Sequence, residues 1–252
     1  MESAYVKTFF KEKVAEIEFY SPAGNSLNSI QLKELTVAIL KAGENKQVAF
    51  IHLKSKGDRA FCAGASFDEL LQIDNLENGT EFFLGFANVI NAMRNCGKII
   101  ITSIQGKTVG GGVGIAAASD YVFATKFASI KLSELSIGIG PFVIEPAVSR
   151  KIGLSNFTAL TLNPTTWKIA NWAQEAGLYQ HILEDIEELN EEVEKYIKQL
   201  STYNSEALNE LKKVLWSNTV LWDELLKQRA KISGALVLSE ETKKALSQFK
   251  NK

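Results

Sequence analysis

The spacing of hydrophobic residues divides the chain into two parts. Over roughly the first 130 residues, segments of alternating or continuous β-branched apolar residues take turns with segments of helical spacing. Alternating strands and helices predict a layered α/β core. Strands are predicted at residues 14–19, 48–53 and 98–104, and helices at residues 30–43 with Ser29 as cap, at residues 81–95, and after Gly112.

Glycine and proline mark the expected loops. Residues 75–80 are polar and contain a glycine, which predicts a mobile loop. Short strands are predicted at residues 121–124 and 128–130, and the Gly- and Pro-rich segment 137–146 predicts a loop that leads into a helix near residues 147–152.

The last third of the chain has a different pattern. From residue 183 onward the strand patterns stop and charged amphipathic segments take their place. We therefore expect an α/β core over residues 1–195 and a helical region over residues 196–252. Helices are predicted at residues 186–200, 206–219, 225–238 and 240–249.

Composition narrows the classes of function. The 252 residues are 46% hydrophobic and 23% charged, which is typical of a globular enzyme-sized chain, and the net charge of −1 gives no support for nucleic acid as a partner. No apolar run approaches the roughly 20 residues that span a bilayer. The first 11 residues lack the apolar core of a signal peptide, and the chain has only two cysteines. These features predict a cytoplasmic protein without a membrane partner.

Two small-residue loops carry the chemistry. Residues 61–66 (Phe-Cys-Ala-Gly-Ala-Ser) and residues 110–114 (Gly-Gly-Gly-Val-Gly) each follow an apolar strand and open a helix. Helix N-termini have unpaired N–H groups, and small residues let a ligand approach the backbone. Two such loops can direct one N–H each at a single oxygen atom, which is the geometry that stabilises an oxyanion.

Other chemistries have weaker patterns. Residues 112–117 match a loose Gly-x-Gly-x-x-Ala dinucleotide pattern, but no acidic strand end follows about 20 residues later. His52 and His181 have no ligand-like residues at metal-site spacing, so no metal is expected. Cys62 lies beside the first loop without a visible base and is interpreted as a packing residue.

The order of these motifs resembles the enoyl-CoA hydratase/isomerase (crotonase) superfamily. The similar segments are residues 58–65 (Asp-Arg-Ala-Phe-Cys-Ala-Gly-Ala), the glycine run 110–112 and residues 118–120 (Ala-Ser-Asp), with weaker matches at residues 25–28, 170–178 and 239–249. The resemblance implies a spiral of ββα repeats followed by a C-terminal helical region that forms trimers, or two stacked trimers.

The resemblance also implies a ligand, an acyl-coenzyme A thioester, with coenzyme A as part of the substrate and no separate cofactor. By the match to the family, Ala65 and Gly111 donate their N–H groups to the thioester oxygen. Binding of the coenzyme is implied for Ser26, Leu27, Ala63, Ala65 and Gly111.

The acid–base residues decide the reaction. Hydratases of this family resemble one another in having two glutamates, and the first of these positions is Gly114 here, whereas the second is Glu134. One carboxylate suits Δ3,Δ2-enoyl-CoA isomerisation, in which a single base moves a proton from C2 to C4. We expect Glu134 to be that base, with its pKa raised by an apolar wall of Leu132, Leu135, Ile137 and Phe142.

Several alternatives stay open at this stage. Glu134 can instead be a solvated loop residue, and Glu145 is a rival carboxylate that would allow hydration. Without turnover, the chain would be an acyl-CoA-binding subunit. Asp120 is interpreted as structural. Candidates for the coenzyme phosphates are Lys54, Lys56 and Arg59, candidates for closing the site are Phe249, Lys250 and Lys252, and candidates for an acyl pocket are Phe82, Phe83, Phe86 and Trp167.

Overall fold

One repeating unit builds two sheets. The computed structural model describes residues 2–250, without the side chains of residues 249 and 250. The first two strands both lie in a six-stranded sheet, and each of the next three strand pairs places one strand in that sheet and the next in a three-stranded sheet before a helical segment follows. The large sheet has the order β1-β2-β3-β5-β7-β9, and the small sheet has the order β4-β6-β8. This arrangement confirms the predicted α/β fold of ββα repeats.

Apart from β1, which is antiparallel to β2, neighbouring strands in both sheets are parallel. Strand β2 alternates between buried and partly exposed residues, as its sequence predicts, and β5 is buried on both faces. The strands are β1 (Tyr5–Lys11), β2 (Val14–Tyr20), β3 (Phe50–Ser55), β4 (Ala60–Cys62), β5 (Ile99–Ile104), β6 (Lys107–Val109), β7 (Tyr121–Thr125), β8 (Ile130–Lys131) and β9 (His181–Leu183).

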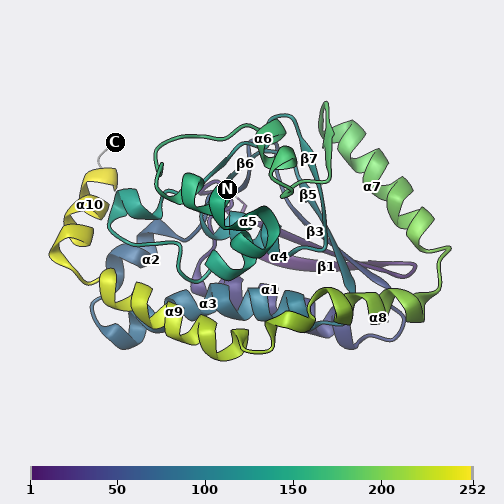
Figure 1. Cartoon of the computed structure of the whole chain (residues 1–252), viewed down its shortest axis with the longest axis horizontal. Helices are drawn as coiled ribbons and strands as arrows, with labels where there is room; N and C mark the ends of the chain where they lie inside the picture. The colour runs from purple at the N-terminus through teal and green to yellow at the C-terminus, as the bar shows by residue number, and fades with distance from the viewer. Residues whose placement is uncertain (1, 251–252) are drawn as a thin grey trace.

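Helices enclose the large sheet from both faces (Figure 1). The α-helices are α1 (Ser29–Glu44), α2 (Phe67–Gln72), α3 (Leu76–Asn95), α4 (Gly111–Ala118), α5 (Glu145–Thr161), α6 (Ala170–Glu175), α7 (Ile186–Leu200), α8 (Ser205–Leu215), α9 (Trp222–Leu236) and α10 (Glu240–Lys250), with short 3-10 helices η1 (Glu134–Ile137) and η2 (Ser217–Thr219). One face packs on α7 through Leu189, Val193 and Ile197, and the other face belongs to the main core.

The prediction of a mobile loop at residues 75–80 is wrong. Asn75 caps α3 by accepting a hydrogen bond from the N–H of Asn78, and the helix begins at Leu76. A Cβ at Gly79 would lie 2.8 Å from the carbonyl oxygen of Gly234 in α9. The glycine is therefore present because two helices cross closely, and not because the chain is flexible there.

Other differences from the sequence predictions concern a helix cap and strands that were not predicted. The cap of α1 is Asn28, whose side chain accepts a hydrogen bond from the N–H of Gln31, and Ser29 is the first helical residue. Strands β4, β6 and β9, of three residues each, were not predicted, because so short a run shows no periodicity. Strand β1 was also not predicted, and it lies at the edge of the large sheet with most of its side chains exposed. An exposed edge strand has no buried face to impose an alternating pattern.

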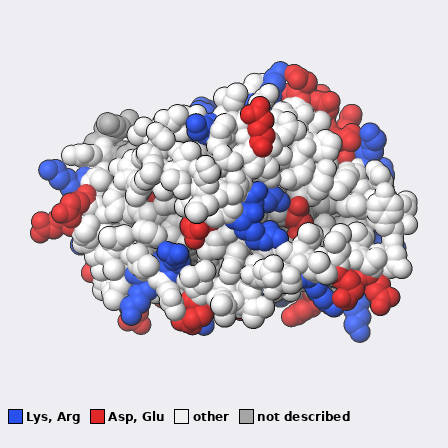
Figure 2. All heavy atoms as spheres, in the orientation of Figure 1, with Lys and Arg blue, Asp and Glu red and all other residues white. Residues whose placement is uncertain are grey.

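The C-terminal helices pack on the chain's own core. Figure 1 shows α9 beside α3, and α10 lies against α2 and η1. The predicted boundary at residue 195 falls inside α7, and the division into two domains stays a prediction. Within residues 2–250 no helix is both long enough and apolar enough to cross a membrane. On the face drawn in Figure 2, charges of both signs gather toward the rim around wide uncharged areas, apart from a basic group near the middle.

Candidate active site

The small sheet brings the three predicted motifs together. Its parallel strands β4, β6 and β8 are neighbours, and each ends in one of the singled-out segments. Residues 63–65 follow β4, the glycine run follows β6, and Glu134 follows β8 at the start of η1. Because the carboxyl ends of parallel strands lie at the same edge of a sheet, segments about 70 residues apart in sequence form one site.

The two small-residue loops meet at their backbones. Gly64 and Gly110 have φ values of +90° and +54°, which L-residues with a side chain rarely adopt. A Cβ at Gly64 would lie 3.8 Å from the amide nitrogen of Gly111. A Cβ at Gly111 would lie 2.1 Å from the ring of Phe86, so a side chain at this position would collide with the wall of the cavity.

The expected oxyanion donors are free to bind a ligand. On either side of Ala65, the N–H of Leu27 donates to the Gly64 carbonyl at 2.9 Å and the N–H of Ser66 donates to the Leu27 carbonyl at 2.9 Å. Within residues 2–250 the N–H groups of Ala65 and Gly111 donate no hydrogen bond to a backbone carbonyl. Gly111 is the first residue of α4, where the N–H groups have no acceptor inside the helix.

Glu134 places its carboxylate beside these donors. A Cβ at Gly110 would lie 2.9 Å from Oε1 of Glu134, and Oε2 is buried without a hydrogen-bond partner in the described part of the chain. Burial raises the pKa of the Glu134 carboxyl to about 7. A carboxylate with one buried oxygen free of hydrogen bonds and a pKa near 7 can both take and return a proton.

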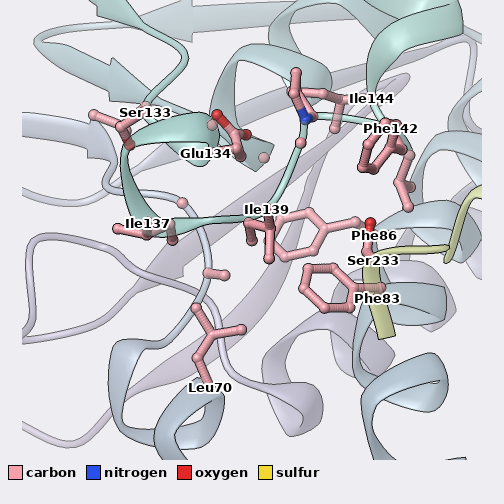
Figure 3. A pocket seen from close by; sticks show the side chains of 18 of the residues that line it. Leu70, Phe83, Phe86, Ser133, Glu134, Ile137, Ile139, Phe142, Ile144 and Ser233 are labelled. Carbon is pink, nitrogen blue, oxygen red and sulfur yellow. The ribbon is translucent and has the colours of Figure 1, made fainter. Parts of the chain in front are cut away.

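A cavity of about 90 Å³ surrounds the carboxylate, and its walls are mainly apolar (Figure 3). The expectation that Ile137 and Phe142 belong to this wall is confirmed. Leu135 is 42% exposed and Leu132 is buried elsewhere, so for these two residues the expectation is wrong. The other apolar side chains of the wall are Ala63, Ala65, Phe67, Leu70, Phe83, Phe86, Val109, Ile139, Pro141, Val143 and Ile144.

The position that lacks a second glutamate is filled by a neighbour. Gly114 lies inside α4, and a Cβ there would be 2.4 Å from Cγ2 of Ile144. Ile144 itself lines the cavity. An apolar side chain therefore occupies the space that any side chain at position 114 would need.

Other predicted residues lie outside the cavity. Leu27 is fully buried and forms a β-bridge with Ala65, so it supports the first loop, and the N–H of Ser26 donates to the Ala23 carbonyl in the preceding turn. Their role in coenzyme binding stays a prediction. Lys54 pairs with Glu16 at 2.8 Å and Lys56 with Glu2 at 2.6 Å. Arg59 is exposed, and the side chains of Phe249, Lys250 and Lys252 lie outside the described residues.

The rival groups have partners of their own. Glu145 is not part of the cavity wall, and one of its carboxylate oxygens lies 3.6 Å from the guanidinium of Arg229. Cys62 is buried, packs against Gly112, and its thiol has a pKa raised to about 12 by burial. Of the aromatic candidates, Phe83 and Phe86 line the cavity, whereas Phe82 and Trp167 do not.

Sequence reasoning missed several wall residues, and three of them show why. Ile139 and Ile144 belong to the Gly- and Pro-rich segment that was singled out only as a loop. Ser233 comes from α9, about 100 residues after Glu134, and no sequence pattern connects the two. The C-terminal helices thus complete the cavity wall from within the same chain.

Comparison with known proteins agrees with this geometry. The sequence profile described as enoyl-CoA hydratase/isomerase matches residues 10–252. The chain is 27% identical over 242 residues to a probable enoyl-CoA hydratase of Bacillus subtilis, covering 95% of this chain and 93% of the relative. It is 29% identical over 180 residues to the short-chain-enoyl-CoA hydratase of Clostridium acetobutylicum, covering 71% and 68%.

Crystal structures described as enoyl-CoA hydratases have the same fold. The crystal structure of an enoyl-CoA hydratase from Bacillus halodurans superposes with a TM-score of 0.89 at 25% identity, covering 97% of this chain and 99% of the other. A mycobacterial enoyl-CoA hydratase, 21% identical, superposes with a TM-score of 0.86 over 99% and 97% of the two chains. With two glycine loops and a buried glutamate meeting on this fold, the chain belongs to the enoyl-CoA hydratase/isomerase family of enzymes.

Proposed function

We propose that this enzyme is a Δ3,Δ2-enoyl-CoA isomerase in which Glu134 is the only acid–base residue. The observation that carries the proposal is the isolation of the Glu134 carboxylate. Its Oε2 is buried without a hydrogen-bond partner among residues 2–250, its Oε1 lies beside Gly110, and the nearby helix position 114 has no side chain. An acyl-CoA substrate follows from the family, whereas the isomerase reaction is our inference.

The first step removes a proton from C2 of a 3-enoyl thioester. The Glu134 carboxylate accepts the proton, and the electron pair of the C2–H bond moves into the thioester, so negative charge develops on the carbonyl oxygen. The N–H groups of Ala65 and Gly111 donate hydrogen bonds to that oxygen. A preorganised donor of this kind lowers a barrier by about 3–4 kcal/mol in a comparable enzyme.

The second step returns the same proton at C4. The intermediate is a dienolate with charge spread over C2, C4 and the oxygen, and protonation of C4 by the Glu134 carboxyl moves the double bond to C2. A group that acts as base and then as acid works best with a pKa near the working pH. The pKa of about 7 that burial imposes on Glu134 meets this requirement.

Hydration is the second candidate, because the relatives named above carry the name hydratase. Adding water across C2–C3 requires a group that holds the water in addition to the group that exchanges the C2 proton. Position 114 is glycine, with Ile144 packed against it, and Glu145 pairs with Arg229 outside the cavity wall. A hydratase would therefore need a second polar group from elsewhere.

The two candidates are separated by the products. The purified enzyme is incubated with trans-3-hexenoyl-CoA and, separately, with trans-2-hexenoyl-CoA, and the thioesters are resolved by chromatography. Interconversion of the two without a 3-hydroxyacyl product supports the isomerase. A 3-hydroxyhexanoyl product contradicts it in favour of hydration, and binding without any product supports a non-catalytic subunit.

We also propose that the enzyme assembles as a trimer or a dimer of trimers. Large apolar side chains of the second half are exposed, including Val220 at 76% and Leu221 at 80%. Exposed apolar groups of this size mark contact surfaces in soluble proteins. Light scattering should give a mass three or six times that of the chain, and the double substitution Val220→Lys with Leu221→Lys should lower it, whereas a monomeric wild-type protein would contradict the proposal.

A further inference from the structure

The segment that carries Glu134 is short. Glu134 is the first residue of η1, a 3-10 helix of four residues, and the side chain of Ser133 before it does not cap the helix. The hydrogen-bond geometry of a 3-10 helix is poorer than that of an α-helix. Figure 3 shows Glu134, Ile137 and Ile139 along one stretch of backbone at the cavity. The position of the Glu134 carboxylate therefore depends also on contacts from outside η1.

The end of η1 is joined to Glu134 through a turn at Gly138. The N–H of Gly138 donates to the carbonyl oxygen of Leu135 at 3.2 Å, and the N–H of Ile139 donates to the carbonyl oxygen of Glu134 at 3.1 Å. Gly138 has a φ of +83°, which glycine adopts without strain. A displacement of Gly138 would therefore move the backbone of Glu134 through these hydrogen bonds.

The turn at Gly138 is held from outside by α10. Thr242 is fully buried, and its hydroxyl donates to the carbonyl oxygen of Gly138 at 2.9 Å. The Thr242 hydroxyl oxygen also accepts a hydrogen bond from the Ser239 hydroxyl at 3.0 Å, so its own proton is directed at Gly138. A Cβ at Gly138 would lie 3.0 Å from Cα of Thr242, so α10 packs closely against the turn.

The packing of α10 alone does not require this hydroxyl. Residues four apart lie on one face of a helix, and Leu246, one turn after Thr242, is buried on that face with an exposed fraction of 1%. An apolar side chain at position 242 would bury as well as Leu246 does. The hydroxyl is therefore explained by the backbone carbonyl that it binds, and this carbonyl belongs to the segment that carries Glu134.

We propose that Thr242 is a positioning residue of the active site, and that its hydrogen bond to Gly138 holds η1 so that the Glu134 carboxylate faces the reacting carbon of the substrate. Thr242 is not part of the cavity wall and acts through the backbone of η1. This inference rests on the proposed role of Glu134 as acid–base residue and extends it to the C-terminal helix. It applies to isomerisation and to hydration, because both exchange a proton at C2.

The test uses variants that separate the hydroxyl from the rest of the side chain. Thr242→Val replaces the hydroxyl by a methyl group, whereas Thr242→Ser keeps the hydroxyl and loses the methyl group. Ser247→Ala is the matched control, because Ser247 is exposed on the same helix and its hydroxyl donates to the Lys243 carbonyl at 2.8 Å. Thermal unfolding shows whether each variant is folded. If Thr242→Val does not fold, Thr242→Ala removes the hydroxyl without placing a methyl group beside the carbonyl.

The first readout compares turnover with binding. Turnover is measured on the hexenoyl-CoA isomer that the wild-type enzyme converts, and binding is measured by calorimetry with saturated hexanoyl-CoA, which does not react. A misplaced base slows the chemical step, so kcat of Thr242→Val should fall about tenfold or more while the dissociation constant stays within about threefold of wild type. Thr242→Ser and Ser247→Ala should keep kcat within about threefold of wild type.

The second readout is the pH dependence of kcat/KM, which a loss of folded protein would not shift. At low pH, kcat/KM falls with the pKa of the essential base, which is about 7 for Glu134 because of its burial. If η1 moves toward water, that pKa falls toward its ordinary value, so the acidic limb of Thr242→Val should shift to lower pH by about half a unit or more.

The charges near η1 do not interfere with this readout. Thr242→Val changes no charge, and Glu134 is the one ionisable side chain of residues 2–250 that lines the cavity. Helices α2 and α10 pack near η1 and against each other, and their charged side chains that the structure describes lie outside the cavity wall; they are Asp68, Glu69, Glu240, Glu241, Lys243 and Lys244.

The outcomes separate this inference from the proposed function. Wild-type kcat with an unshifted acidic limb in Thr242→Val overturns the inference while the role of Glu134 stands. An equal loss of kcat in Thr242→Val and Thr242→Ser also overturns it, because the loss would then come from packing and not from the hydroxyl. Wild-type turnover in Glu134→Gln overturns the proposed function itself, and Thr242 would then have no base to position.

Discussion

Two buried carboxylates lie within 15 residues of each other in sequence and have opposite surroundings. Asp120 follows α4, and its side chain is 4% exposed. Its Oδ2 accepts hydrogen bonds from the Ile100 N–H at 2.7 Å and from Lys212 at 2.6 Å, and its Oδ1 accepts one from the Trp216 indole at 2.7 Å. This confirms the structural role expected for Asp120 and ties α8 to the sheet.

Among residues 2–250, in contrast, Oε2 of Glu134 has no hydrogen-bond partner, and the cavity wall around the carboxylate is mainly apolar. A buried charge that is fully hydrogen-bonded is stable in one protonation state, whereas a buried charge without partners stays close to neutralisation. Two carboxylates with buried oxygens therefore act differently, Asp120 as an anchor and Glu134 as a reactive group. The difference lies in the donors around each carboxylate and not in the residue type.

The largest effect should come from removing the reactive carboxylate. Glu134→Gln keeps the shape of the side chain but cannot accept the C2 proton, so isomerase turnover should fall by about 10²–10⁴-fold. Binding of saturated acyl-CoA should change little, because the oxyanion loops are intact. Steady-state kinetics and calorimetry measure the two quantities. Turnover within threefold of wild type would contradict the role of Glu134 as the only base.

Removing the anchoring carboxylate should act on stability instead. Asp120→Ala leaves the Lys212 ammonium, which is 1% exposed, without its counter-ion, and breaking a buried pair in this way costs about 3–5 kcal/mol. Urea unfolding measures the loss. Lys212→Met in the Asp120→Ala background should recover part of it. If Asp120→Ala cost less than about 1 kcal/mol, the three hydrogen bonds would not be anchoring α8.

The reactive carboxylate should itself cost stability above neutral pH. Its pKa is about 7 when folded and 4.5 without perturbation. Between these values the folded chain holds a proton that the unfolded chain has lost, so the free energy of unfolding falls as the pH rises from about 4.5 and levels off above 7.

Glu134→Gln removes this pH-dependent fall in the free energy of unfolding. The variant should therefore be more stable than the wild type by up to about 3 kcal/mol at pH 8, with no gain near pH 4. Urea unfolding of both proteins at the two pH values tests this. A gain of equal size at both values would point to packing and not to charge.

Much of this contrast can be predicted from the sequence. The two small-residue loops follow from the physical chemistry of helix N-termini, whereas the role of Glu134 follows from the resemblance to the family, and Asp120 was interpreted as structural. The strands that the two loops follow, β4 and β6, have only three residues each and were not predicted, so the small parallel sheet that gathers the three segments at one edge is a finding of the structure.

What the sequence could not predict are contacts between distant segments. Gly79 has the local pattern of a loop residue, and only Gly234, 155 positions later, explains it as a helix crossing. Ser233 closes the cavity, and Lys212 pairs with Asp120, because α8 and α9 fold back onto the core. Local propensity contains no information on which surface a late amphipathic helix will cover.

The smallest expected effect tests why the site has one carboxylate and not two. Gly114→Ala adds a Cβ that would lie 2.4 Å from Ile144, and adding a methyl group to a filled core costs about 1–3 kcal/mol. Ile144→Ala opens space beside position 114, so the double variant should be more stable than the sum of the two single losses predicts.

A thermodynamic cycle of the four proteins by urea unfolding measures this coupling, which should reach about 0.5 kcal/mol or more. Additive losses would mean that α4 has room beside Ile144, and that only the residue type at position 114 keeps a second side chain out of the site. Losses of unfolding free energy that are not additive would mean that the packing of Ile144 against α4 excludes a second side chain from the site. Restoring a second acid–base group would then require changes at both positions, and the isolation of Glu134 would be a property of the core as well as of the site.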